Sequence, residues 1–302
     1  MENSPHILVI GSANMDMVIQ TSHFPSPGET IIGGDFSLIP GGKGANQAVA
    51  ASRLGGKVCF ISQLGKDLFG NNNLDNFKKE GIDTSQIKQN DEQPSGVALI
   101  TVNQEGENTI IVAPGANHFL SKEDLLKAES KFAEAEILLM QLEIPLETVL
   151  AGKKLAKKFD KKVILNPAPA SDLGEEFYKG LYLITPNETE AELLSGIKVI
   201  DEKSAHAAAS ELASKGVENV IITLGASGAY VFSEGFKGII PTEKVKAIDT
   251  TAAGDTFNGA LAVSLAKGKN LKSAVVFALR AATLSVQKLG AQSSIPTLEE
   301  LS

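Results

Sequence analysis

One run near the C-terminal end combines small residues with an aspartate: Asp249-Thr250-Thr251-Ala252-Ala253-Gly254-Asp255-Thr256-Phe257. Apolar or small side chains recur at helical spacing from there on, at Phe257, Leu261, Ser264 and Leu265. We therefore expect residues 252–255 to begin a helix with one apolar face, whose free N–H groups would favour a phosphate. Asp255 could then take a proton from an attacking hydroxyl group. Alternatively, Asp255 only stabilises the first helical turn.

A second glycine cluster spans residues 40–47, with the sequence PGGKGANQ, and opens another expected helix. Glycines at a helix start allow the backbone to approach a polar ligand closely. The cluster is not a P-loop, because the spacing G-x-x-x-x-G-K-[ST] is absent. The alternative is a flexible turn with a solvated Lys43.

Polar residues follow several short apolar runs, at the positions where strands of a sheet would end. Ligands of α/β sheets bind beyond the carboxyl ends of the strands. A polyol needs several directed hydrogen bonds, because each hydroxyl group loses water on binding. Donors and acceptors suited to such a ligand are Asn14, Asp16, Lys43, Asn46 and Glu143. For Asn14 and Asn46, a local turn or cap role remains an alternative.

Short apolar runs alternate with helical patterns along most of the chain. The expected strands are 6–10, 58–62, 137–142, 163–166, 181–185 and 220–224. The expected helices are 43–54, 68–80, 145–159, 187–195 and 204–215. This alternation predicts an α/β fold: a three-layer sandwich with a central, mostly parallel sheet flanked by helices.

A different pattern marks four segments of the N-terminal third, 17–19, 30–39, 96–102 and 108–112. They read as short strands with polar alternation and turn residues. We predict that they form a small, discontinuous β-sheet lid, built from about residues 14–40 and 95–113, within a single domain spanning 1–302.

The composition is that of an ordinary globular protein, with 43% hydrophobic and 21% charged residues among 302. A net charge of −8, without basic runs interleaved with aromatic residues, argues against a nucleic-acid partner. No apolar stretch approaches the roughly 20 residues that span a bilayer, so no membrane partner is expected. A single cysteine, Cys59, suits a reducing compartment, and we expect a cytoplasmic protein.

Taken together, the motifs resemble those of the ribokinase-like (PfkB) carbohydrate kinases. They occur in family order at residues 11–16 (GSANMD), 41–50 (GGKGANQAVA), 140–143 (MQLE), 166–170 (NPAPA), 185–190 (TPNETE), 223–225 (TLG), 249–259 (DTTAAGDTFNG) and 290–292 (GAQ). The resemblance implies ATP-dependent phosphorylation of D-ribose at O5, with Mg²⁺ and K⁺ as cofactors and a homodimer as the assembly. Rival hypotheses are a sibling kinase for another sugar or a nucleoside, and a non-catalytic ribose sensor.

The resemblance also implies roles for individual residues. Asp255 would be the general base, with Ala252, Ala253 and Gly254 completing an anion hole. The sugar would contact Asn14, Asp16, Gly42, Lys43, Gly44, Asn46, Glu143 and Asp255. The nucleotide and its hydrated Mg²⁺ would lie against Asn187, Glu190, Thr223, Leu224, Gly225, Ala226, Ser227, Gly228, Gly254, Asp255 and Leu279. For Asn187 and Glu190 the alternative is an N-cap with a capping box at the start of a helix. Leu279 departs from the family, in which Asn or His is common there. A K⁺ ion would be held by Asp249, Thr251, Ser285, Lys288, Gly290 and Ser294.

Overall fold

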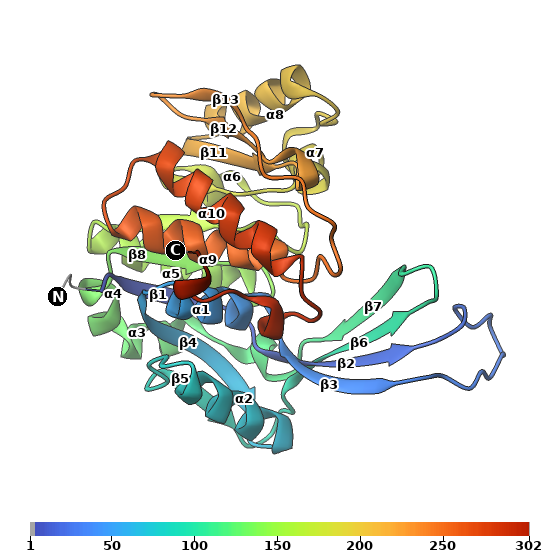
Figure 1. Cartoon of the computed structure of the whole chain (residues 1–302). Helices are drawn as coiled ribbons and strands as arrows, with labels where there is room; N and C mark the ends of the chain where they lie inside the picture. The colour runs from blue at the N-terminus through green and yellow to red at the C-terminus, as the bar shows by residue number, and fades with distance from the viewer. Residues whose placement is uncertain (1–3, 302) are drawn as a thin grey trace.

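A nine-stranded sheet forms the centre of the molecule in a computed structural model that describes residues 4–301 (Figure 1). The strand order is β13-β12-β11-β10-β9-β8-β1-β4-β5. In chain order the strands are β1 (His6–Ile10), β4 (Lys57–Gly65), β5 (Ile87–Asn90), β8 (Ile137–Met140), β9 (Lys162–Leu165), β10 (Leu181–Ile184), β11 (Val217–Thr223), β12 (Ala229–Phe232) and β13 (Lys237–Ile240). Pairing is parallel from β5 to β11 and antiparallel at β12 and β13, so the predicted mostly parallel sheet is confirmed.

Helices cover both faces of this sheet. They are α1 (Lys43–Arg53), α2 (Leu68–Lys79), α3 (Lys122–Lys127), α4 (Glu129–Glu134), α5 (Leu146–Lys158), α6 (Glu175–Tyr178), α7 (Glu188–Ser195), α8 (Glu202–Ser214), α9 (Ala253–Ala266) and α10 (Leu271–Ser285). Alternate residues of β1 belong to two separate cores. Ile7 and Val9 belong to the core that contains residues of α1, α9 and α10, whereas Leu8 and Ile10 belong to the core that contains residues of α5 and α8. The three-layer prediction is therefore confirmed.

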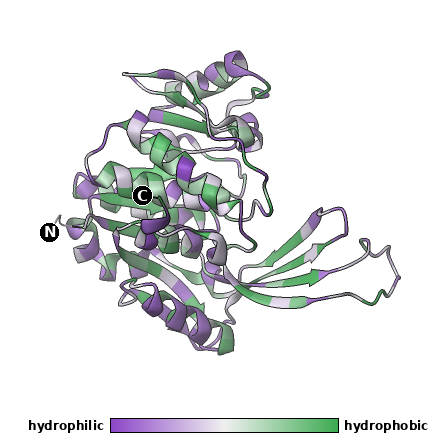
Figure 2. Cartoon of the chain, in the orientation of Figure 1, coloured by the Kyte–Doolittle hydropathy of each residue, from purple (hydrophilic) through white to green (hydrophobic). Residues whose placement is uncertain are grey.

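Helix α9 differs from the prediction of a single apolar face. Every residue from Asp255 to Leu265 is buried, because α1 and α10 pack against this helix in the layer that it shares with them. In Figure 2 its ribbon lies among the hydrophobic segments of that layer. The prediction of a single apolar face was therefore wrong, because α9 is enclosed on all sides.

A second, four-stranded sheet projects from the body beside the carboxyl end of β1 (Figure 1). Its order is β3-β2-β6-β7, from β2 (Asn14–Gln20), β3 (Phe36–Gly41), β6 (Gly96–Val102) and β7 (Asn108–Ala113). Residues 30–35 were expected to be part of a strand but lie outside β3. We call β2, β3, β6 and β7 the small sheet. Among residues 4–301, no helix is long and apolar enough to cross a membrane.

Candidate active site

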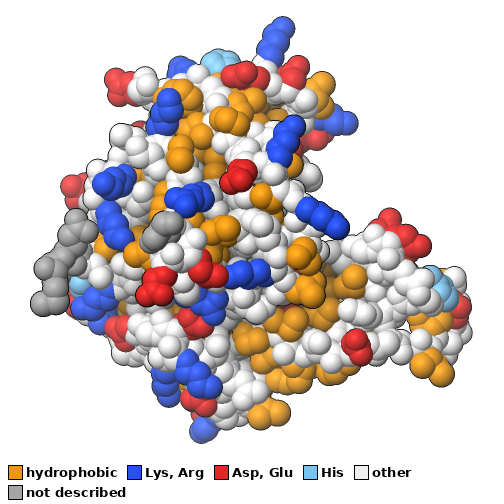
Figure 3. All heavy atoms as spheres, viewed as in Figure 1, with side chains coloured by type: hydrophobic (Ala, Val, Ile, Leu, Met, Phe, Trp, Pro, Cys, Tyr) orange, Lys and Arg blue, Asp and Glu red, His pale blue; other side chains and the backbone are white. Residues whose placement is uncertain are grey.

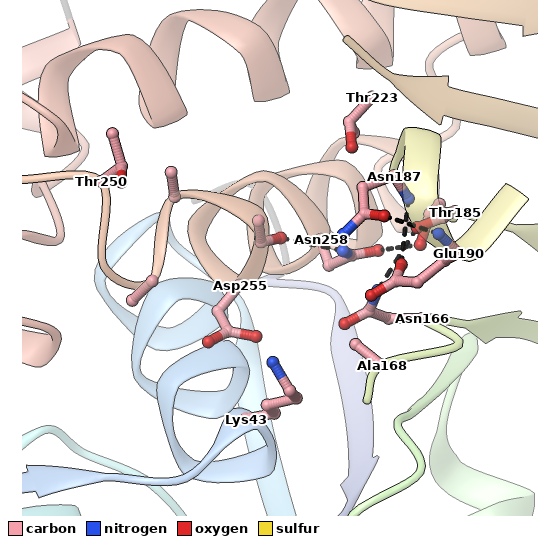
Figure 4. Close-up of a pocket in the computed structure, with 13 residues that line it drawn as sticks. Lys43, Asn166, Ala168, Thr185, Asn187, Glu190, Thr223, Thr250, Asp255 and Asn258 are labelled. Carbon is pink, nitrogen blue, oxygen red and sulfur yellow. Dashed lines mark hydrogen bonds between the residues drawn. The ribbon is translucent and has the colours of Figure 1, made fainter. Parts of the chain in front are cut away.

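A polar cleft of about 220 Å³ opens where the carboxyl ends of the central strands meet the start of α9 (Figure 4). Segments far apart in the sequence contribute to it, as expected at the carboxyl edge of a parallel sheet. The lining residues are Lys43, Asn166, Ala168, Thr185, Asn187, Glu190, Thr223, Thr250, Ala252, Ala253, Gly254, Asp255 and Asn258.

Asp255 lies in the first turn of α9 and is only 7% exposed. Its Oδ1 accepts a hydrogen bond from Gln47 Nε2 at 2.9 Å, and its Oδ2 accepts one from Asn46 Nδ2 at 3.0 Å. The helix N-cap is Ala252, with φ of 59° and no side-chain cap. The carboxylate of Asp255 is thus held by α1 and makes no hydrogen bond that caps α9. Burial raises the pKa of Asp255, while Lys43 and the two amide donors oppose that rise.

Lys43 extends toward the Asp255 carboxylate across the cleft (Figure 4). Burial on its own would lower the pKa of Lys43, but the carboxylates of Asp255, Glu143, Glu190 and Asp16 outweigh it and hold this pKa above its usual value. Lys43 is therefore a charged group inside an acidic site, and the alternative of a solvated lysine is wrong.

Two further carboxylates lie near Lys43. Asp16, on β2, is 9% exposed, and its pKa rises to about 7 because it is buried and because Glu143 and Asp255 are close. Glu143 follows β8, and its Oε2 accepts hydrogen bonds from Ser12 Oγ at 2.5 Å and from the Lys43 N–H at 3.0 Å. The small sheet and the body thus each supply an acidic group to one site.

The glycines at the start of α1 are explained first by close packing inside the protein. Gly42, the N-cap, has φ of 89°, and a Cβ there would lie 2.7 Å from the Asn14 nitrogen. A Cβ on Gly44 would lie 2.5 Å from the Ser12 nitrogen. These residues let α1 approach the turn between β1 and β2. Close approach to a ligand and a flexible turn were the two expectations for these glycines, and neither included this packing against the turn after β1.

The two asparagines predicted to contact the sugar have partners inside the protein. Asn14 Oδ1 accepts a hydrogen bond from Asn117 Nδ2 at 2.8 Å. Asn46 donates to Asp255, while its own Oδ1 is buried without a partner among the described residues.

On the other side of the cleft, Asn187 and Glu190 form a capping box at the start of α7. The Glu190 N–H donates to Asn187 Oδ1 at 2.8 Å, and the Asn187 N–H donates to Glu190 Oε2 at 2.9 Å. The capping role considered from the sequence is therefore real. Both side chains still line the cleft, and burial raises the pKa of Glu190.

An apolar cavity of about 220 Å³ adjoins the polar cleft, with Thr250 and Ala253 lining both. Its other lining residues are Gly225, Ala226, Thr242, Glu243, Val245, Ala247, Leu279, Ala282, Thr283 and Val286. Leu279, Gly225 and Ala226 thus come together as predicted for one ligand, while Leu224, Ser227 and Gly228 line neither cavity. Gly228 has φ of 100°, and a Cβ there would lie 2.1 Å from the Ile240 oxygen, so it serves the turn between β11 and β12.

The residues predicted to hold a monovalent cation lie on two adjoining segments. Asp249 accepts hydrogen bonds from the N–H groups of Thr251 at 2.9 Å and Gly290 at 2.8 Å. Burial would raise the pKa of Asp249, but these bonds outweigh it and keep the pKa below its usual value. Ser285 and Ser294 are fully buried and donate their hydroxyl protons to the carbonyls of Ala282 and Ala291. Lys288 forms an ion pair with Glu300.

No role was predicted for five polar residues of the site: Gln47, Asn166, Thr185, Thr250 and Asn258. Asn166 and Thr185 directly follow β9 and β10. They therefore carried the same signal, a polar residue at a strand end, that pointed to Glu143. Gln47 offered no such signal, since it lies inside a helix.

Comparison with known proteins gives the family of this chain. Residues 4–298 match the pfkB family of carbohydrate kinases. The chain is 49% identical to the ribokinase of Haemophilus influenzae over 97% of this chain and 96% of that one. Its fold matches ribokinase from Thermotoga maritima, with a TM-score of 0.90, 43% identity and coverage of 99% and 98% of the two chains. It also matches Arabidopsis thaliana ribokinase, solved with ribose and ATP, with a TM-score of 0.91, 30% identity and coverage of 99% and 98%. The chain belongs to the pfkB family of carbohydrate kinases.

Proposed function

We propose that this protein is a ribokinase, which transfers the γ-phosphoryl group of ATP to O5 of D-ribose and forms D-ribose 5-phosphate. The observation that carries this proposal is the position of Asp255. It is a buried carboxylate at the start of α9, beside small residues and facing Lys43, in a polar cleft that shares Thr250 and Ala253 with the adjoining apolar cavity.

In the proposed reaction, Asp255 accepts the proton of the O5 hydroxyl group as O5 attacks the γ-phosphorus. The O5–P bond forms, the bond from phosphorus to the bridging β,γ-oxygen breaks, and ADP leaves. The N–H groups at the start of α9 would stabilise the charge on the transferring phosphoryl group. A Cβ on Gly254 would meet no protein atom within 4 Å, so this part of the turn is open to a ligand.

The sugar would lie among Asn14, Asp16, Lys43 and Glu143, which offer both donors and acceptors for hydroxyl groups. The adenine would enter the apolar cavity, where Leu279 supplies packing surface but no hydrogen bond. The small sheet would act as a lid that excludes water from the reaction.

Asn187 and Glu190 fit a hydrated magnesium ion, which neutralises phosphate charge when bound. Glu190 lines the cleft, and its Oε1 has no hydrogen-bond partner among the described residues. Those residues contain no cluster of three His, Cys, Asp or Glu side chains suited to enclose a metal. This donor set suits an ion that retains most of its water.

A panel of sugars tests the proposed function. ADP formation from ATP and Mg²⁺ should require a sugar, and D-ribose should give a higher kcat/KM than 2-deoxyribose, fructose or adenosine. Phosphorus NMR of the product should show a phosphate ester at O5. Faster turnover of adenosine would instead favour a nucleoside kinase. Ribose binding without ADP formation would favour a non-catalytic sensor.

We also propose a monovalent-cation site between the segments of Asp249 and Gly290. Ser285 and Ser294 use their hydroxyl protons on carbonyls, so their oxygen lone pairs remain available, and Lys288 is held away by Glu300. A bound cation would hold residues 249–251 in place, so that the N–H groups at the start of α9 converge on the phosphate of the nucleotide.

Potassium should therefore raise turnover above the rates in sodium or tetramethylammonium at equal ionic strength and saturating Mg²⁺. The activation should disappear in Asp249→Ala, with circular dichroism confirming that the variant is folded. Equal rates in all three salts would exclude the cation site.

The small sheet also supports the proposal of a homodimer. Strand register places Ile19, Phe36, Leu38, Leu99 and Ile111 on one face. Phe36 is 58% exposed, Leu99 50% and Ile111 69%, and Figure 3 shows hydrophobic side chains gathered along this part of the molecule. A second copy could cover such a face. Light scattering should give twice the mass of the chain, and Leu99→Lys should yield monomers. A monomeric wild-type protein would contradict this.

A further inference from the structure

Gln47 contacts Asp255 directly, although none of the roles proposed above involves Gln47. Its Nε2 donates to Asp255 Oδ1 at 2.9 Å and to Asn166 Oδ1 at 3.0 Å. Its Oε1 accepts from Gln141 Nε2 at 2.5 Å. We propose that Gln47 is the positioning residue of the catalytic base: it holds the Asp255 carboxylate in the orientation that receives the sugar proton. This inference rests on the base role proposed for Asp255.

Only an amide satisfies all three contacts of Gln47. The position requires two donors, toward Asp255 and Asn166, and one acceptor, toward Gln141. A glutamate would place an oxygen against the Asp255 carboxylate, and a hydroxyl side chain has a single donor. The Asp255 carboxylate prevents the amide from turning over, because a flipped amide would place its oxygen against the Asp255 oxygen. The orientation of Gln47 is therefore determined by its neighbours, and Gln47 is fully buried.

The hydrogen bonds continue from Gln47 around the back of the site and return to α9. Asn166 Nδ2 donates to the Thr185 carbonyl at 3.3 Å, and Thr185 Oγ1 donates to Asn258 Oδ1 at 2.7 Å. Asn258 Nδ2 then donates to the Gly254 carbonyl at 2.8 Å. Figure 4 shows this part of the chain of bonds beside the cleft. Because Gly254 precedes Asp255, the ring is closed through the first turn of α9.

This closed ring joins α1, the ends of β9 and β10, and α9 through buried polar groups. A ring of satisfied hydrogen bonds resists rotation of any one member more strongly than a single bond does. The Asp255 side chain is thus fixed from both directions: through Gln47 at its carboxylate and through Asn258 at its backbone. Misplacing a reacting group by about 1 Å can cost about 100-fold in rate.

The test is a double-mutant cycle between Gln47→Met and Asp255→Ala, read as kcat in the ATP- and ribose-saturated enzyme. Methionine keeps the length of the side chain and removes the amide. Gln47→Met alone should lower kcat by about 10- to 100-fold, with ATP affinity unchanged. In the Asp255→Ala background it should change the residual rate by less than about 3-fold, because its effect passes through Asp255. If Gln47 had only a structural role, Gln47→Met would lower kcat by the same factor in the wild-type and Asp255→Ala backgrounds.

The pH profile supplies a second measure. Loss of an N–H donor to a carboxylate disfavours its charged form, so the acid limb of kcat should move to higher pH in Gln47→Met. Gln141→Met removes only the hydrogen bond from Gln141 to Gln47. It should change kcat and its acid limb in the same direction by smaller amounts, and it replaces Gln47→Met in the test if that variant does not fold. Asn219→Leu is the matched control: Asn219 is buried and bonded to the Tyr182 carbonyl on β10, at a distance from the cleft. Its kcat should stay that of wild type.

The outcomes separate the inference from the proposed function. An Asp255→Ala variant that retains wild-type kcat would overturn the base role itself. An inactive Asp255→Ala together with a wild-type rate in folded Gln47→Met would overturn only the role of Gln47. The role of Gln47 would also be overturned if Gln47→Met lowered kcat by the same factor in the wild-type and Asp255→Ala backgrounds and left the acid limb of kcat at the same pH.

Discussion

Asp255→Asn is expected to lower kcat by about 10²–10⁴-fold, the usual cost of losing a general base. The structure adds a reason for a loss near the upper end. Both carboxylate oxygens accept amide N–H groups, from Asn46 and Gln47. An amide at position 255 would turn its own N–H₂ group toward one of these donors, so the side chain would shift from its place.

Asp255→Ala avoids this conflict and should lose turnover to a similar degree. Both variants should still bind ATP and ribose, which calorimetry can measure separately from turnover. If either folded variant kept more than about a tenth of the wild-type kcat, a base role worth even the low end of the expected range would be excluded.

Asp16→Asn should weaken ribose binding by about 10- to 100-fold, the cost of a charge-assisted hydrogen bond to a substrate hydroxyl group. Affinity for ATP in the absence of sugar should not change. For the wild type, kcat/KM for ribose should fall as the pH drops below about 7, because Asp16, whose pKa is raised to about 7, becomes protonated. The part of this limb that Asp16 causes should be absent in Asp16→Asn, in which the titration of Asp255 remains. Unchanged ribose affinity in the folded variant would remove Asp16 from the sugar site.

The same substitution should stabilise the fold. The pKa of Asp16 is about 7 in the folded protein and near 3.8 without the fold, so the folded state binds the proton more tightly. The contribution of Asp16 to the free energy of unfolding therefore falls as the pH rises from about 4 to 7. Above pH 7 the destabilisation by the charged Asp16 is complete. Asp16→Asn should therefore show a higher Tm than wild type at pH 8 and a smaller difference at pH 5. Asp75→Asn, on the exposed side of α2, should show neither effect.

Local features of this protein could be predicted well from its sequence. Strands β1 and β6 match their expected bounds, because apolar runs between turn residues are short-range signals. The capping box of Asn187 and Glu190 was also expected, since it joins residues three positions apart. The resemblance to the carbohydrate kinases carried the function, because its motifs are short blocks in a set order.

Features that depend on contacts between distant segments could not be predicted in this way. The burial of α9 on all sides depends on which helices pack around it, and a single helix shows only its own periodicity. The glycines of residues 41–44 were expected to make room for a ligand, yet Gly42 and Gly44 also make room for the turn after β1. Whether Lys43 is solvated or enclosed depends on carboxylates from four other segments.

The sequence by itself determined the sheet, the layers around it and the residues that begin α9, because these follow from local periodicity and short motifs. Only the tertiary structure decided how the Asp255 carboxylate is held, because Gln47 lies 208 positions away from it in the chain. The geometry of a buried hydrogen-bond network depends on how helices and strand ends pack together. The local sequence around either residue does not show which residue will be its partner.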